Sequence, residues 1–165
     1  MSENEEKALK TIKNYMWWSM GAGLVPVPLL DLIAVSGVQV KMLAELSKIY
    51  EVPFQESRGK VLIGSLVGSI APAALSFGAA GSAIKAIPVV GAFAGAPAMV
   101  LFCGASAWAL GKVFIQHFES GGTFLNFNPE QVKEYFKAQF EEGRAIAGTM
   151  GSRGSAAGKK AEVPA

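Results

Sequence analysis

The sequence predicts an all-α fold, in which a glycine-rich hydrophobic helical hairpin packs with amphipathic helices and is inserted in a membrane. Three observations lead to this fold class. Residues 61–111 hold one charged side chain, Lys85, which falls where the two uncharged halves must turn. Each half is longer than the roughly 20 apolar residues that cross a bilayer core of about 30 Å. Segments with the apolar spacing of helices flank this stretch on both sides.

The composition agrees with one small, apolar domain. The chain has 165 residues, of which 51% are hydrophobic and only 17% are charged, whereas an average soluble domain has about 25% charged residues. We expect a single helical, membrane-associated domain over residues 1–147 and a disordered C-terminal tail over residues 148–165. The acidic N-terminus is unlike a signal peptide, so internal segments would direct membrane entry.

The first helix is predicted to begin at Ser2, which can cap it, with Glu5 three residues later. Apolar residues at three- and four-residue spacing form one face of this helix, namely Leu9, Ile12, Met16 and Met20. The aromatic residues Tyr15, Trp17 and Trp18 form a cluster on the same segment. Such a cluster suits a membrane–water interface or a packed core, and the sequence favours neither.

The second helix is predicted to begin at Pro28, because the missing N–H of proline costs nothing at a first helical position. Pro26 and Pro28 force an extended backbone just before it. The apolar run over residues 24–34 is short for a membrane span and contains Asp31. An acidic residue at membrane depth is a functional candidate. We favour the simpler interpretation, in which Asp31 interacts with the positive end of the helix dipole.

Small residues recur every three or four positions in the predicted third and fourth helices. The third helix carries Gly64 and Gly68, and the fourth, which starts at Pro88, carries Gly91 and Gly95. Further small residues follow in the fourth helix, namely Gly104, Ala107 and Gly111. This spacing lets helices approach closely and is typical of packing in membranes. We therefore predict that Gly64, Gly68, Gly91 and Gly95 are helix-packing positions, as in a glycine zipper.

The segment after residue 111 is polar again and predicts one more helix. A pair of glycines, Gly121 and Gly122, ends the fourth helix, and the aromatic segment 123–128 can fold back on the core. Asn128, Pro129 and Glu130 provide a cap, a first-turn proline and a first-turn acid for a fifth helix. This helix is amphipathic and would dock on the bundle or on a partner.

Basic side chains determine the predicted orientation. They precede the first apolar segment and the third helix and follow the fourth, at Lys7, Lys10, Lys13, Lys41, Lys48, Arg58, Lys60 and Lys112. Lys85 alone marks the opposite end. Because positive residues are retained on the cytoplasmic side, we expect a protein of the cytoplasmic (inner) membrane with both termini in the cytoplasm.

No motif for catalysis, a metal or a cofactor is present in the sequence. The nearest string to a phosphate-binding loop, residues 104–113, has six residues between its glycines where four are needed. Cys103 and His117 are the single cysteine and histidine and lie about 21 Å apart along one helix. We expect Cys103 to be a small buried hydrophobe and His117 a surface residue at a helix end. A net charge of +2 without a basic stripe argues against nucleic-acid binding.

A short sequence pattern resembles a known bacterial family. Residues 24–32, LVPVPLLDL, are followed by GVQVKML at 37–43, and a glycine-rich hairpin comes next. This order is similar to that of the YcjF-like domain of unknown function over residues 22–118. Members of that family are commonly membrane-associated and often fused to, or encoded beside, small GTPases, so the resemblance implies a GTPase partner supplied in trans. The resemblance implies no catalytic residue. The positions that it implies as structural or contact residues are Pro26, Pro28, Asp31, Gln39 and Lys41.

These observations favour a non-enzymatic membrane protein that acts as an anchor or scaffold module, with membrane lipid and a GTPase as partners. The first alternative is a membrane-active homo-oligomer that forms a pore or remodels lipid. The second alternative is a soluble all-α domain in which the other helices shelter the apolar hairpin.

Overall fold

The computed structural model describes residues 1–22, 28–80 and 88–161, and regular structure in these ranges is entirely helical. Within them, the predicted all-α fold is confirmed. The helices are α1 (Glu3–Ala22), α2 (Pro28–Ile49), α3 (Glu56–Ala80), α4 (Pro88–Glu119) and α5 (Pro129–Ala161). The predicted turn of the hairpin at Lys85 lies outside the described residues.

Local signals placed most helix ends correctly. The Ser2 hydroxyl accepts a hydrogen bond from the Glu5 backbone N–H at 3.1 Å, which is the expected N-terminal cap of α1. Pro28, Pro88 and Pro129 are the first residues of α2, α4 and α5, where a proline loses no helical hydrogen bond.

The C-terminal end of α4 is closed by a left-handed glycine. Gly121 has a φ of 78°, and its N–H bonds to the carbonyl of Phe118 at 2.9 Å. The next amide, of Gly122, bonds to the carbonyl of His117 at the same distance. A backbone with positive φ is readily adopted by glycine, so the predicted end of the fourth helix at this pair is confirmed.

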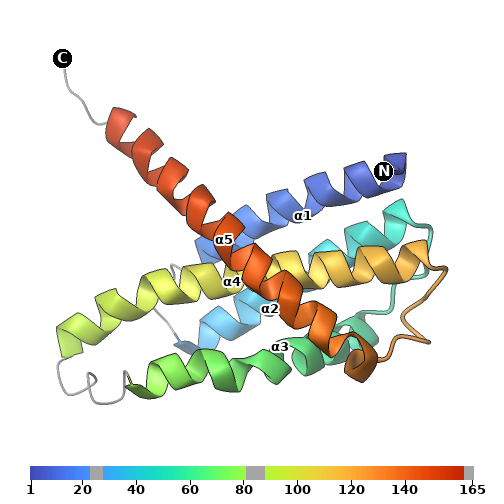
Figure 1. Ribbon diagram of the computed structural model, residues 1–165, viewed down its shortest axis with the longest axis horizontal. Coiled ribbons are helices and arrows are strands. Elements are labelled where there is room, and N and C mark those ends of the chain that lie inside the picture. The colour runs from blue at the N-terminus through green and yellow to red at the C-terminus, as the bar shows by residue number, and fades with distance from the viewer. Residues whose placement is uncertain (23–27, 81–87, 162–165) are drawn as a thin grey trace.

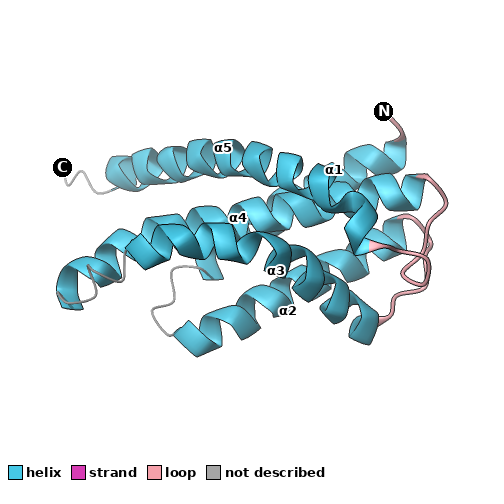
Figure 2. Cartoon of the chain, turned by 60° about the horizontal axis from the view of Figure 1, so that its bottom comes forward, coloured by secondary structure: helices cyan, strands magenta, loops and turns pink. Residues whose placement is uncertain are grey.

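Helix α4 is the centre of the bundle and contacts each of the other four helices (Figures 1 and 2). Helix α5 lies across α4 and extends along one side of the molecule. This central position follows from composition, because the middle of α4, residues 103–115, is almost entirely buried. A helix that is apolar on every side is stable only when other helices cover it.

An aromatic cluster fills the core where α4 ends. The ring of Phe114 stacks on that of Phe127 with centroids 4.6 Å apart, and lies 5.5 Å from those of Phe118 and Phe124. Phe124 and Phe127 belong to the segment between α4 and α5, so this connection folds back on the core as expected. Leu125 in the same segment is 61% exposed.

Two expectations differ from the structure or remain open. The tail that was expected to be disordered from residue 148 continues α5 to Ala161, and at its start the partly buried Met150 packs against the core. The hydroxyls of Thr149 and Ser152 also bond to carbonyls three residues earlier. In the part of the chain that the structure describes, no helix combines the length and hydropathy needed to cross a bilayer. The spanning hairpin therefore remains a prediction.

Candidate functional site

The fold separates charged from uncharged segments along the bundle. Residues 17–40 contain one charged residue, Asp31, and residues 61–111 contain one, Lys85. The parts of these stretches that the structure describes lie at one end of α1–α4, which we call the apolar end (residues 17–22, 28–40, 61–80 and 88–111). The remaining residues of these four helices and their connections form the charged end.

Specific contacts establish this antiparallel arrangement. At the charged end, the Glu119 carboxylate at the end of α4 accepts hydrogen bonds from Ser2 and Tyr50, each at 3.2 Å. Arg58 in α3 donates to the backbone carbonyls of Phe124 and Leu125 at 3.3 and 3.1 Å. Helix starts and helix ends therefore alternate around the bundle, and each uncharged segment points to the same side.

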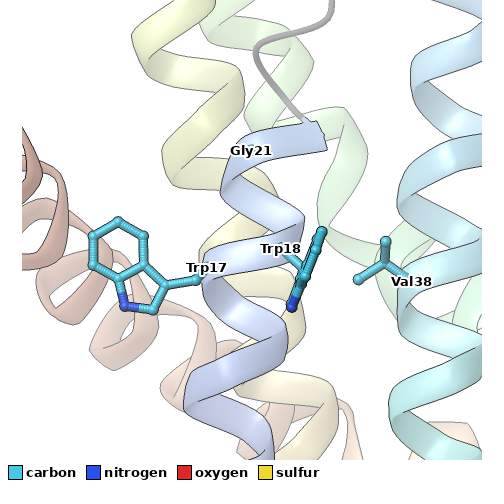
Figure 3. Close-up of a pocket in the computed structure, with 4 residues that line it drawn as sticks. All are labelled: Trp17, Trp18, Gly21 and Val38. Carbon is cyan, nitrogen blue, oxygen red and sulfur yellow. The ribbon is translucent and has the colours of Figure 1, made fainter.

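Exposed tryptophans lie at the border between the two ends. Trp17 is 48% exposed and Trp18 is 71% exposed. Trp18 faces Val38 of α2 across an open cleft of about 400 Å³, which Gly21 and Trp17 also border. The ring of Trp17 points away from α2 (Figure 3). These two rings do not form part of the packed core, whereas Tyr15 of the same cluster packs against it. Amphipathic aromatic rings settle where a polar and an apolar medium meet.

The positions carried over from the family resemblance do not converge on one site. Pro28 and Asp31 are the first and fourth residues of α2, and Pro26 lies outside the described residues. Gln39 is 1% exposed, and its Nε2 atom has no hydrogen-bond partner among the described residues. Lys41, two positions later, is exposed. Gln39 is therefore a core residue, whereas Lys41 is open to a partner.

Two of the four glycines named as helix-packing positions do not pack within the chain. Gly64 and Gly68 are exposed, and a Cβ atom built on either has nothing within 4 Å. Their predicted role in helix packing is therefore wrong within this bundle, because α3 turns this face to solvent. Gly91 and Gly95 belong to α4, but their packing lies outside what the structure describes.

Close helix contacts are made at Gly104, Gly111 and Gly143. A Cβ atom on Gly104 would meet Met20 of α1 at 2.8 Å, and one on Gly111 would overlap Ile12. A Cβ atom on Gly143 of α5 would lie 3.0 Å from the backbone of Ala105. Gly143 was not predicted as a packing position, although it follows Phe136 and Phe140 and precedes Ala147 at helical spacing. That periodicity was the available signal.

Tyrosine–carboxylate pairs hold the charged end together. Tyr15 donates to Glu45 at 2.7 Å and joins α1 to α2. Burial, and then this hydrogen bond, raise the pKa of Tyr15 to about 12. Burial, followed by the Glu119 carboxylate, also raises the pKa of Tyr50. Both effects keep the hydroxyls protonated, so they remain hydrogen-bond donors to the carboxylates.

The described residues offer no grouping for metal binding. No three histidine, cysteine, aspartate or glutamate side chains come together in these ranges. Cys103 is buried, as predicted. His117 is half-buried rather than a plain surface residue, because its Nε2 atom contacts the Thr123 carbonyl at 2.9 Å and the Asn126 side-chain oxygen at 3.1 Å. It therefore anchors the connection to α5.

The fold and these features define an all-helical domain with one charged end and one apolar end, bordered by exposed tryptophans. Its sequence matches the profile of the domain of unknown function DUF697 over residues 1–145, and the chain belongs to that family. This confirms the resemblance at the level of a domain family of unknown function.

A relative with a descriptive name supports this assignment. Over 146 residues the chain is 38% identical to the magnetosome membrane protein 22 of Magnetospirillum gryphiswaldense. The aligned region covers 88% of this chain and 75% of that protein. No solved structure matches the chain.

Proposed function

We propose that this protein is a non-enzymatic membrane-associated module, which inserts its apolar end in the bilayer and presents its charged end as a scaffold. The observation that carries the proposal is the position of the uncharged segments, which come from four helices and gather at one end. The magnetosome membrane protein 22 is named as a membrane protein and is related over most of its length, which supports the same location.

The exposed tryptophans support an insertion boundary near Trp17 and Trp18. Beyond them, the helical parts of the apolar end carry Asp31 as their one charged residue in the described ranges. The basic residues lie mainly at the charged end and in α5, so this end would face the cytoplasm of a bacterial cell. Reporter fusions at each terminus would test the orientation, which is proposed to place both termini in the cytoplasm.

A charge on an exposed position of α3 tests the proposal. Gly68 is exposed with nothing within 4 Å of a built Cβ atom, so Gly68→Lys fits the folded bundle in water. In a bilayer core, the same lysine costs up to about 3 kcal/mol. We expect wild-type protein to stay with membranes in carbonate extraction and Gly68→Lys to be released in larger part.

The matched control is Gly148→Lys, which adds the same charge at an exposed glycine of α5 with nothing within 4 Å. It should remain with the membrane like the wild type. Complete release of the wild-type protein by carbonate would instead support a soluble all-α domain.

The class of partner is proposed from the family resemblance alone. A small GTPase supplied in trans would bind the charged end, where Lys41 is exposed on α2. Pull-down with candidate GTPases in both nucleotide states should show state-dependent binding that Lys41→Glu weakens. Lys13→Glu, at another exposed lysine, should bind like the wild type.

A membrane-active oligomer is the second candidate, and one observation favours it. The open face of Gly64 and Gly68 would let a helix of a second copy approach closely. Leakage of dye from liposomes in the presence of the wild-type protein would support this function, provided that Gly64→Leu, which blocks this face, prevents the leakage. Retention of the dye by the wild-type protein would favour the anchor.

A further inference from the structure

The last part of α5 is a cationic arm. After Glu142, the helix carries Arg144, Arg153, Lys159 and Lys160 and contains no acidic residue to its end at Ala161. The guanidinium of Arg144 already pairs with Glu141 at 3.2 Å. In the sequence, the other three cations are followed by one acidic residue, Glu162, directly after the helix, so the segment keeps an excess of positive charge. We call residues 144–161 the basic arm.

The basic arm lies beside the exposed tryptophans. A Cβ atom built on Gly151 would meet Met20 of α1 at 3.9 Å, so the arm crosses α1 just beyond Trp17. Trp17 projects from α1 on the side opposite α2 (Figure 3). Arg153 is exposed two positions after Gly151. Because two residues span more than half a helical turn, Arg153 lies on the face of α5 that is turned away from Met20 and is open to solvent. The arm thus begins at the border of the apolar end, with an exposed cation just past its contact with α1.

The direction of α5 keeps the arm out of the apolar segments. The C-terminal end of α5 is well separated from the neighbouring ends of α3 and α4 (Figure 1). When the apolar end inserts, the arm can therefore stay among lipid headgroups. Lysine and arginine near an anionic bilayer surface gain favourable electrostatic energy there, and tryptophan prefers the same depth.

We propose that the basic arm, together with Trp17, binds the headgroups of anionic phospholipids and so selects the membrane surface on which the protein inserts. The inference rests on the proposed membrane association. It adds the chemical class of lipid, because the excess positive charge of the arm complements a negative surface and gains nothing from a zwitterionic one.

Flotation of the full-length purified protein with two kinds of vesicle tests the inference. One kind contains phosphatidylcholine alone, and the other contains phosphatidylcholine with phosphatidylglycerol. The arm variant is Arg153→Gln/Lys159→Gln/Lys160→Gln. The matched control, Lys7→Gln/Lys10→Gln/Lys48→Gln, removes the same charge from exposed positions at the charged end.

We expect the wild type and the control to bind the anionic vesicles more tightly than the neutral ones. The arm variant should lose this preference, by about fivefold for each cation and about 100-fold in total at low salt. High salt should reduce the preference of the wild type, because it screens surface charge. Trp17→Ala should weaken binding to both kinds of vesicle.

The two proposals fail in different ways. Equal binding of the wild type to neutral and anionic vesicles would overturn the role of the arm and leave membrane association intact. The same holds if the arm variant keeps its preference for anionic vesicles. A wild-type protein that floats with neither kind of vesicle would overturn the proposed function itself.

Discussion

A Cβ atom on Gly111 would overlap the side chain of Ile12, which is fully buried on α1. Isoleucine is branched at Cβ and holds one rotamer in a helix, so it cannot move aside freely. The absence of a side chain at this position lets α1 and α4 approach. Gly68 is the opposite case, because it is helical, exposed and open.

Alanine at Gly111 and alanine at Gly68 should change the free energy of unfolding in opposite directions. Gly111→Ala should lower the free energy of unfolding by about 1–3 kcal/mol, because it overpacks the α1–α4 contact. Gly68→Ala should raise it by about 0.5–1 kcal/mol, because alanine favours the helix. Urea unfolding followed by circular dichroism measures both. A stabilised Gly111→Ala protein would contradict the contact.

The hydrogen bond of Tyr15 to Glu45 predicts a dependence on alkaline pH. The folded chain raises the pKa of Tyr15 from 10.0 to about 12, so it binds this proton more tightly than the unfolded chain does. The resulting stabilisation is complete below pH 10 and is lost as the pH rises to about 12. Tyr15→Phe should make the fall of the unfolding free energy over this range shallower. An unchanged slope would show that the hydroxyl does not contribute.

At the scale of elements, α5 depends on both its start and its packed face. The side-chain oxygen of Asn128 accepts the N–H of Glu130 at 3.1 Å and caps the helix. Phe136, Phe140, Gly143 and Ala147 then lie buried on one side. The cap forms between residues that are neighbours in the sequence, whereas the buried face of α5 is stable only when it packs against α4.

Removal of the cap should weaken the helix measurably. Asn128→Ala is expected to lower the free energy of unfolding by about 1 kcal/mol, because one backbone N–H loses its acceptor. Asn14→Ala, at an exposed position within α1, is the control and should be neutral or slightly stabilising. Equal effects of the two substitutions in thermal unfolding would argue against the cap.

At the scale of the whole molecule, one aromatic core joins segments that are distant in sequence. Phe114 of α4 contacts Phe124 and Phe127 from the connection to α5, and Phe54 before α3 packs its ring against Phe124 at 5.5 Å. The N-terminus of α1 reaches the same end through Ser2 and Glu119. The charged end is therefore a packed unit, and the same core continues into the described part of the apolar end through Met20, Leu66 and Leu110.

Truncation of the central ring should destabilise the entire bundle. Phe114→Ala is expected to cost about 3–5 kcal/mol, because Phe114 is fully buried and its cavity cannot collapse. Leu125→Ala, at a 61% exposed side chain in the adjoining loop, should change stability by less than about 0.5 kcal/mol. Loss of helix α5 alone, with the other helices retained, would contradict a single cooperative core.

The sequence by itself determined the helical class and most helix ends, because caps, prolines and terminal glycines act on the backbone within a few residues. Pro28, Pro88 and Asn128 were placed correctly for this reason. Only the tertiary structure decided which small residues pack. Gly64 and Gly111 look alike in sequence, but the rotation of each helix turns one to solvent and the other to Ile12.

The same distinction applies to the candidate site. The uncharged stretch 61–111 was evident from its composition, whereas its alignment with residues 17–40 depends on the antiparallel order of four helices. The burial of Gln39 and the cleft beside Trp18 also arise from contacts between helices. Local patterns cannot determine such contacts, because they depend on how the helices rotate and cross when the shared core is packed.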